Sequence, residues 1–167
     1  DEGNGIDFAA IRACAEVIVQ CAAVEENGFA NLRFSALANV KAQGPFFPGS
    51  FHDETQPCGF SIAIEAADGV VNAFTGAKSL MQARETLLST LEGYAHKIEG
   101  VITKVPPPQP YRFYGFDFSV APFPRDTHSL GNALEILGVP QLGYHGSLAA
   151  AAFLADTLDR GRWKRAG

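Results

Sequence analysis

Histidine and carboxylate side chains stand where predicted strands end or predicted helices begin. The candidate catalytic residues are His52, Glu65, Asp117 and His145. Ligands in α/β sheets and barrels bind beyond the carboxyl ends of the strands, so this placement predicts a site there. If the two histidines and two carboxylates converge, they suit a divalent metal or acid–base chemistry. Their long and irregular spacing does not by itself bring them together.

Asp117 lies on the polar face of a predicted strand over 111–120, with Ser119 beside it as a candidate binding residue. A carboxylate on a buried strand needs a partner, or its pKa rises. The alternative to a functional role is an ion pair with an arginine such as Arg33 or Arg112.

Glu65 ends a predicted buried strand over 59–66, whose centre is rich in β-branched residues. The same carboxylate at the exit of a strand could instead cap the helix that follows. Both readings place Glu65 at the end of the strand.

His145 directly precedes a helix that begins with Gly146 and Ser147, two further candidate binding residues. Free N–H groups at the start of a helix favour anions and bias a histidine there toward its neutral form. Neutral imidazole can ligate a metal or act as a base. The simpler alternative is that His145 and Ser147 only cap the helix.

His52 closes the loop QGPFFPGSFHDE (43–54), in which three phenylalanines stand among glycines and prolines. The loop could form a rigid aromatic wall that presents His52, or it could fill a hole in the core. A lone histidine is more often structural, so His52 is the weaker candidate.

Composition narrows the class of protein. The chain has 167 residues, 47% hydrophobic and 19% charged, which indicates one globular domain over 1–167. A formal net charge of −5 argues against non-specific binding to nucleic acid or to an anionic membrane. The longest apolar runs, such as LAAAAFLA, are too short to span a bilayer.

The three cysteines, Cys14, Cys21 and Cys58, show no metal-binding spacing. On a helix, Cys14 and Cys21 would be roughly 10 Å apart, too far for a disulfide. We therefore expect buried free thiols in a reducing compartment, and a cytoplasmic protein.

Hydrophobic periodicity predicts the helices. Asp7 is a predicted N-cap for an amphipathic helix that stops at Asn27–Gly28 and whose apolar residues follow at 3-4-3-4 spacing: Phe8, Ile11, Ala15, Ile18 and Ala22. Ser79 and Gln82 form a capping box before a helix that runs to about Ile98, with the apolar stripe Leu80, Ala83, Leu87, Leu91, Tyr94 and Ile98.

Shorter elements complete the prediction. Residues 31–40 are predicted as a buried strand, 68–77 as a short helix or turn, and 105–110 as a polyproline-type connection. Ser129 is expected to cap a helix that ends at Gly138, and a last helix follows His145.

The alternation of helices and strands predicts an α/β domain with mostly parallel strands and packing helices. Three short strands are too few for a closed barrel or a well-covered sheet, so the domain is expected to be partial. The chain carries no Walker loop, no G-x-G-x-x-G, no H-E-x-x-H and no G-x-S-x-G motif.

Several blocks carry a resemblance to a known family: GFANLRFSALANV, GPFFPGSFH, FSIAIEAAD, GFDFSVAPFP, SLGNALEILG and HGSLAAAAFLAD. In order from about Gly5 to Gly161, they resemble an uncharacterised, pyruvate-formate-lyase-like family, domain of unknown function 711. The resemblance implies an α/β barrel related to glycyl radical enzymes. It also implies that segments of the family before and after this chain are absent, so that the full barrel is either completed by other protein chains or not built.

The resemblance implies no catalytic residues. Radical enzymes of the lyase type need a glycine in a dedicated loop and usually a cysteine opposite it, and only Cys58 is a conceivable thiyl residue here. A glycyl radical is therefore not expected, whereas a divalent metal stays a candidate cofactor.

Two functions follow as hypotheses. The first is a barrel enzyme that binds a small, anionic metabolite and uses acid–base or metal-assisted chemistry. The second is a non-catalytic structural or interaction subunit of a larger assembly, since exposed sheet edges need covering.

Overall fold

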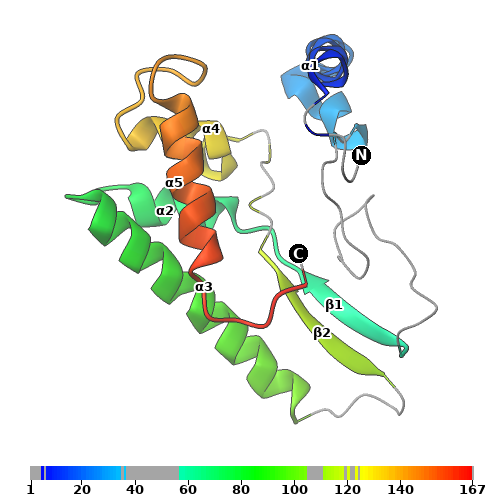
Figure 1. Cartoon of the computed structure of the whole chain (residues 1–167), viewed down its shortest axis with the longest axis vertical. Helices are drawn as coiled ribbons and strands as arrows, with labels where there is room; N and C mark the ends of the chain where they lie inside the picture. The colour runs from blue at the N-terminus through cyan, green and yellow to red at the C-terminus, as the bar shows by residue number, and fades with distance from the viewer. Residues whose placement is uncertain are drawn as a thin grey trace.

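The computed structural model describes residues 5, 7–34, 36, 57–104, 111–118, 120, 123 and 125–166. Among them, helices pack beside a two-stranded parallel sheet (Figure 1). The mixed helix and strand content agrees with the predicted α/β class, and no barrel is seen in the described part of the chain. No helix in that part is long and apolar enough to cross a membrane.

The sheet pairs β1 (Gly59–Ala63) with β2 (Arg112–Asp117) in parallel. Gly59 pairs with Arg112 at one end and Ala63 with Asp117 at the other, with a bulge between Phe60 and Ser61. Parallel strands need a long crossover connection, and α2 (Ala67–Phe74) and α3 (Leu80–Ile102) lie in that connection. Both strands match predicted strands, but each is shorter than expected.

The end of the chain lies along the other edge of β2. The Phe116 N–H donates to the Lys164 carbonyl at 2.7 Å, and the Ala166 N–H donates to the Phe116 carbonyl at 3.0 Å. This parallel bridge between Phe116 and Arg165 requires a close approach at Gly115, where φ is +136°. A Cβ on Gly115 would lie 2.5 Å from the Lys164 carbonyl oxygen, so only glycine fits without a shift.

The segment 68–77, predicted as a short helix or turn, is helical up to Phe74 in α2 (Ala67–Phe74), and a turn follows. Helix α3 (Leu80–Ile102) begins at the predicted cap, where the Ser79 hydroxyl oxygen accepts the Gln82 N–H at 3.1 Å. The Gln82 side chain returns to the Lys78 N–H at 2.8 Å. The capping prediction is therefore confirmed, and the helix runs one turn further than expected.

The stripe predicted for α3 is only partly buried. Its central residues are buried, whereas Leu80 and Tyr94 are exposed and Ala95 is buried instead. The core is one cluster of side chains from α2, α3, α4 (Leu130–Ile136), α5 (Ser147–Asp159) and the aromatic residues of β2. Ser129 caps α4 as predicted, since its hydroxyl oxygen accepts the Asn132 N–H at 3.2 Å.

Helix α1 (Phe8–Ala22) begins at Asp7, whose carboxylate accepts the N–H groups of Ala9 and Ala10. The helix is confirmed but ends before Asn27–Gly28. These two residues adopt left-handed φ values of 56° and 72° inside the following 3₁₀ segment η1 (Glu26–Arg33). Figure 1 shows α1 and η1 together, apart from α2 to α5.

The strand predicted over 31–40 is wrong for residues 31–33, which belong to η1. The turn at Asn27–Gly28 commits the backbone to local 3₁₀ bonds, and the Asn31 side chain donates to the Ile18 carbonyl of α1 at 3.2 Å. Local contacts therefore override the apolar pattern. Residues 37–40, the aromatic loop over 43–54 and the connection 105–110 lie outside the described residues.

The cysteines were expected to be buried, and this is only partly correct. All three are free thiols; Cys14 and Cys21 are half-buried, whereas Cys58 is exposed. Cys58 directly precedes β1, where its carbonyl accepts the Arg112 N–H at 2.9 Å. The backbone of Cys58 therefore forms a hydrogen bond of the sheet, while its side chain is exposed to solvent.

Helices α3 and α5 are joined by an ionic network. The Arg84 guanidinium lies 2.5 Å from the Asp156 carboxylate and 4.9 Å above the Phe153 ring. Arg160 binds the same carboxylate at 2.9 Å. The hydrogen bond from Arg160, together with the charges of both arginines, lowers the pKa of Asp156 below its ordinary value of 3.8.

We expect Gly115→Ala to lower the free energy of unfolding by about 1–3 kcal/mol, because a side chain there is strained and collides with the Lys164 carbonyl. Trp163 is the only tryptophan, so its fluorescence during urea unfolding reports on this segment. Gly93→Ala in α3 is the matched control and should stabilise by about 0.5–1 kcal/mol, since a helical alanine there meets no atom. Equal stability of Gly115→Ala and the native chain would contradict the prediction.

Asp156→Asn should destabilise the fold at neutral pH and lose this effect in acid. The lowered pKa means that ionised Asp156 stabilises the fold above its ordinary value of 3.8, and that this contribution disappears as the pH falls through the folded-state pKa. The difference in urea midpoint between the variant and the native chain should therefore shrink below pH 3.8. A difference that stays constant with pH would show that the charge of Asp156 contributes nothing.

Candidate functional site

Two predicted site residues lie at the same edge of the sheet. Because β1 and β2 are parallel, their carboxyl ends meet, and Ala63 pairs with Asp117 at that end. The ladder continues one residue further, since the Ile64 N–H donates to the Asp117 carbonyl at 2.9 Å. Glu65 follows directly. The structure thus brings Glu65 and Asp117 to one edge from two segments that are distant in sequence.

The two carboxylates differ in their surroundings. Asp117 is buried, with 7% of its surface exposed, whereas Glu65 is exposed. The Asp117 side chain lies at the end of a strand whose neighbours Phe116 and Phe118 are both buried.

The structural alternative for Glu65, a cap on the following helix, is not observed. Helix α2 begins at Ala67 after the N-cap residue Ala66 and has no side-chain cap, so Glu65 does not cap it. Arg33, one of the two arginines expected to pair with Asp117, binds Glu25 at 2.6 Å. Glu65 is therefore available at the edge of the sheet.

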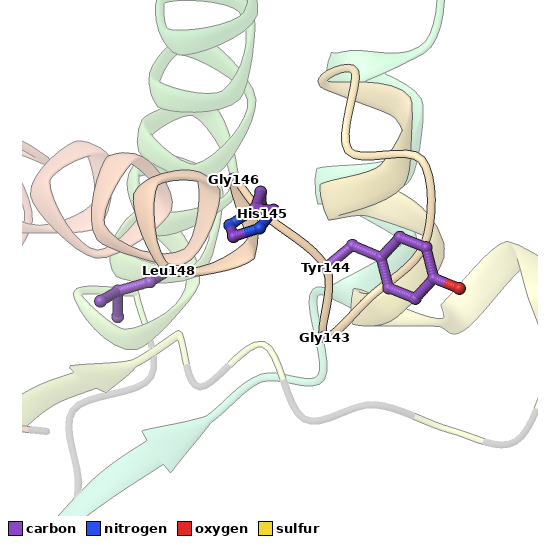
Figure 2. Close-up of a pocket in the computed structure, with 5 residues that line it drawn as sticks. All are labelled: Gly143, Tyr144, His145, Gly146 and Leu148. Atoms are coloured by element: carbon purple, nitrogen blue, oxygen red, sulfur yellow. The ribbon is translucent and has the colours of Figure 1, made fainter.

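His145 lies in a different surface pocket, at the amino end of α5. This pocket has a volume of about 540 Å³ and is lined by Gly143, Tyr144, His145, Gly146 and Leu148. Figure 2 shows the Tyr144 ring and the Leu148 side chain pointing away from each other, with the His145 ring between them. His145 and Tyr144 are exposed, so the pocket is open to solvent.

The start of α5 is built by the backbone rather than by a cap. Gly146 occupies the N-cap position in a left-handed conformation and has no side chain to offer. The Ser147 hydroxyl instead accepts the Gly143 N–H at 2.8 Å and donates to the Tyr144 carbonyl at 2.8 Å. The alternative in which Ser147 caps the helix is therefore not observed; Ser147 closes the preceding turn, and the amino end of α5 faces the pocket of His145.

The structure does not bring His145 to the carboxylates. Helix α5 has 13 residues and is therefore roughly 20 Å long. Its carboxyl end contacts the chain beside β2, because Asp159 binds Arg165 at 2.9 Å and Arg165 pairs with Phe116. His145 stands at the opposite end. The other two predicted residues, His52 and Ser119, lie outside the described residues.

A second pocket was missed at the sequence level. It has a volume of about 530 Å³, lies between α2, η2 (Asp126–His128) and α4, and is lined by Val71, Asp126, Thr127, Asn132, Glu135 and Ile136. The Glu135 carboxylate already accepts the Leu142 N–H at 2.8 Å. Only the polar residues around Ser129 could have indicated this pocket, and they also match an ordinary helix start.

The described residues contain no group of three or more side chains that could hold a metal ion. At the carboxyl edge of the sheet, Glu65 and Asp117 supply two possible carboxylate ligands. Mg²⁺ is often bound by one or two carboxylates, with water and substrate oxygens completing the shell. The edge can therefore supply proton transfer, or part of a shell for a hard divalent cation.

Comparison with known proteins identifies relatives over almost the whole chain. A family model described as "Uncharacterised ACR (DUF711)" matches residues 1–166. A UPF0210 protein of Pyrobaculum islandicum is 31% identical over 162 residues, which are 95% of this chain and 35% of that protein. A UPF0210 protein of Bifidobacterium longum is 30% identical over 165 residues, 95% of this chain and 36% of that protein.

The chain thus spans about a third of the length of the curated relatives that it matches. No solved structure matches it. The names of the family and of these relatives state no activity and mention no radical enzyme. Because the family model covers nearly every residue, the chain belongs to the uncharacterised family DUF711, which agrees with the resemblance seen in its sequence blocks.

Proposed function

We propose that this chain is part of an enzyme that binds a small, anionic metabolite at the carboxyl edge of its parallel sheet. One observation carries the proposal: the pairing of Ala63 with Asp117, which sets Glu65 and Asp117 at the same edge. Ligand sites of α/β proteins occur at such edges. The α/β barrel, with His52 at its mouth, belongs to the same proposal, whereas His145 belongs to a separate anion-binding place at the amino end of α5.

Glu65 and Asp117 take complementary roles in this proposal. The exposed Glu65 exchanges protons with a ligand or binds a divalent cation, and the buried Asp117 orients the ligand from the last position of β2. If a cation is bound, it neutralises the charge of the anionic metabolite beside these carboxylates. His145 supplies a second anion-binding group, because the amino end of α5 favours negative charge.

We expect inorganic phosphate with Mg²⁺ to shift the backbone amide NMR signals of residues 64–66 and 116–118. The mass of 17.8 kDa suits amide-resolved titration. Asp117→Asn and Glu65→Gln should each weaken this binding about tenfold or more, because each removes one charge from the edge. Glu85→Gln, an exposed carboxylate on α3, is the matched control and should change nothing.

The proposal fails if no signal near the edge responds, or if both variants bind as the native chain does. A third possible result is a response confined to residues 144–149. This would assign anion binding to the amino end of α5 alone and would remove the carboxylate edge from the proposal.

His145 has its own prediction. His145→Ala should weaken phosphate binding at residues 144–149 without changing the response at the carboxyl edge, since roughly the length of α5, about 20 Å, separates the two places. The same amide titration measures both responses. Loss of the edge response in His145→Ala would show instead that the two places form one site.

A non-catalytic subunit is the second candidate function. Large apolar side chains are exposed on both α1 and α5, including Val19 at 71% and Leu148 at 85%. Exposed apolar surface of this kind is typical of proteins that bind other chains. Unchanged ligand titrations in every variant above, together with stable association with other chains, would favour this function.

A further inference from the structure

One side of α1 presents large apolar side chains to solvent. This apolar face of α1 consists of Phe8, Ile11, Ile18 and Val19, whose exposed fractions run from 44% at Ile18 to 71% at Val19. At 100° per residue, the four side chains fall within roughly 100° of one another around the helix axis. No residue of α1 is buried. The described part of the chain therefore does not supply the stabilisation that burial of this face would give.

Another side of α1 already holds the helix in place. Its half-buried residues are Cys14, Val17 and Cys21. The Asn31 side chain of η1 donates to the Ile18 carbonyl at 3.2 Å. Within the described residues, η1 is the main contact of α1, and Figure 1 shows the pair apart from α2 to α5. The apolar face is thus a second surface, separate from the one that η1 uses.

Strand β1 is also poorly covered. None of its residues, Gly59–Ala63, is buried, whereas the last three residues of β2 are buried. Parallel sheets occur almost only where both faces are covered. Figure 1 shows β1, like α1, on the side of the molecule away from α3 and α5. Two separate elements on that side therefore lack the cover that such elements usually have.

The relatives of this chain indicate what covers these elements. The 165 matched residues are only 36% of the Bifidobacterium longum protein, so nearly two thirds of that polypeptide lies outside the match. A segment linked in the same polypeptide has an effective concentration on the order of millimolar, far above that of an ordinary second copy. A two-fold contact with a second copy covers one patch of about 800 Å² on each partner. Parallel strands, in contrast, are joined by crossovers within a single chain, so the sheet type and the extra length both favour the remainder of the polypeptide.

We propose that, in full-length members of the family, the apolar face of α1 and strand β1 form an internal interface with the remaining two thirds of the polypeptide. A helix of that part packs on the apolar face, because apolar side chains gathered on one side of a helix fit a facing helix. The interface lies within one molecule and does not join copies. The inference does not depend on the proposed enzyme site, because it uses neither Glu65 nor Asp117.

Carbene footprinting of this chain and of the full-length Bifidobacterium longum protein tests the proposal. Photoactivated diazirine labels side chains according to their accessibility, and mass spectrometry locates the label. We expect the positions aligned with Phe8, Ile11 and Val19 to label at least about fivefold less in the full-length protein, because core side chains are commonly about 95% buried. The positions aligned with Glu16 and Gln20, on the polar side of α1, are the matched control and should label to a similar extent in both proteins.

Ile11→Glu tests the same interface through stability. In this chain the variant should leave the urea midpoint nearly unchanged, because Ile11 is 54% exposed. The aligned substitution in the full-length protein should raise the equilibrium constant for unfolding at least about 100-fold, since it buries an unpaired charge. Gln20→Glu adds the same charge outside the apolar face and should be neutral in both proteins. Far-UV circular dichroism follows unfolding in each case.

Three results would overturn the proposal. Equal labelling of the apolar face in both proteins would show that the rest of the polypeptide does not cover it. Protection that appears in this chain as its concentration rises, or that the full-length protein loses on dilution, would assign the face to a second copy. Equal tolerance of Ile11→Glu in both proteins would show that the face stays exposed. The labelling comparison uses unsubstituted proteins, so it decides the question where the full-length variant does not fold.

Discussion

The described fold depends on the position of Phe116 at the centre of the sheet. Its backbone lies opposite Ile62 of β1 on one side, and on the other side its N–H donates to the Lys164 carbonyl and its carbonyl accepts the Ala166 N–H. Its side chain is fully buried, with ring centroids 5.1 Å from Phe113 and 5.7 Å from Phe118. Moving this residue would disturb β1, the end of the chain and the aromatic core together.

The positions of the residues at the carboxyl edge of the sheet depend on these contacts of Phe116. Asp117 follows Phe116 directly, so its place beside Glu65 depends on the register that Phe116 keeps with Ile62. Trp163 strengthens the same region, because its ring lies 4.8 Å from Phe118 in an edge-to-face contact. The proposed site thus lies beside a buried aromatic cluster, as a site that positions ligands requires.

Local signals in the sequence predicted the helices well. Asp7, Ser79 and Ser129 each cap a helix as expected, because a cap depends only on a side chain and the N–H groups two or three residues later. The same locality explains the error at residues 31–33. The left-handed turn at Asn27–Gly28 selects a 3₁₀ segment, whereas the apolar run alone indicates a strand.

Local patterns in the sequence were enough to predict three helix caps, the two strands, the family and the polar residues at strand ends. Which of these residues lie close together depends on how the strands and helices pack. The parallel pairing of β1 with β2 places Glu65 and Asp117 at the same edge of the sheet. His145 lies at the far end of α5, roughly 20 Å along the helix from the end that contacts the chain beside β2. The tertiary structure also decided that the apolar face of α1 is exposed, because a periodic pattern marks an apolar face but does not specify which neighbour covers it.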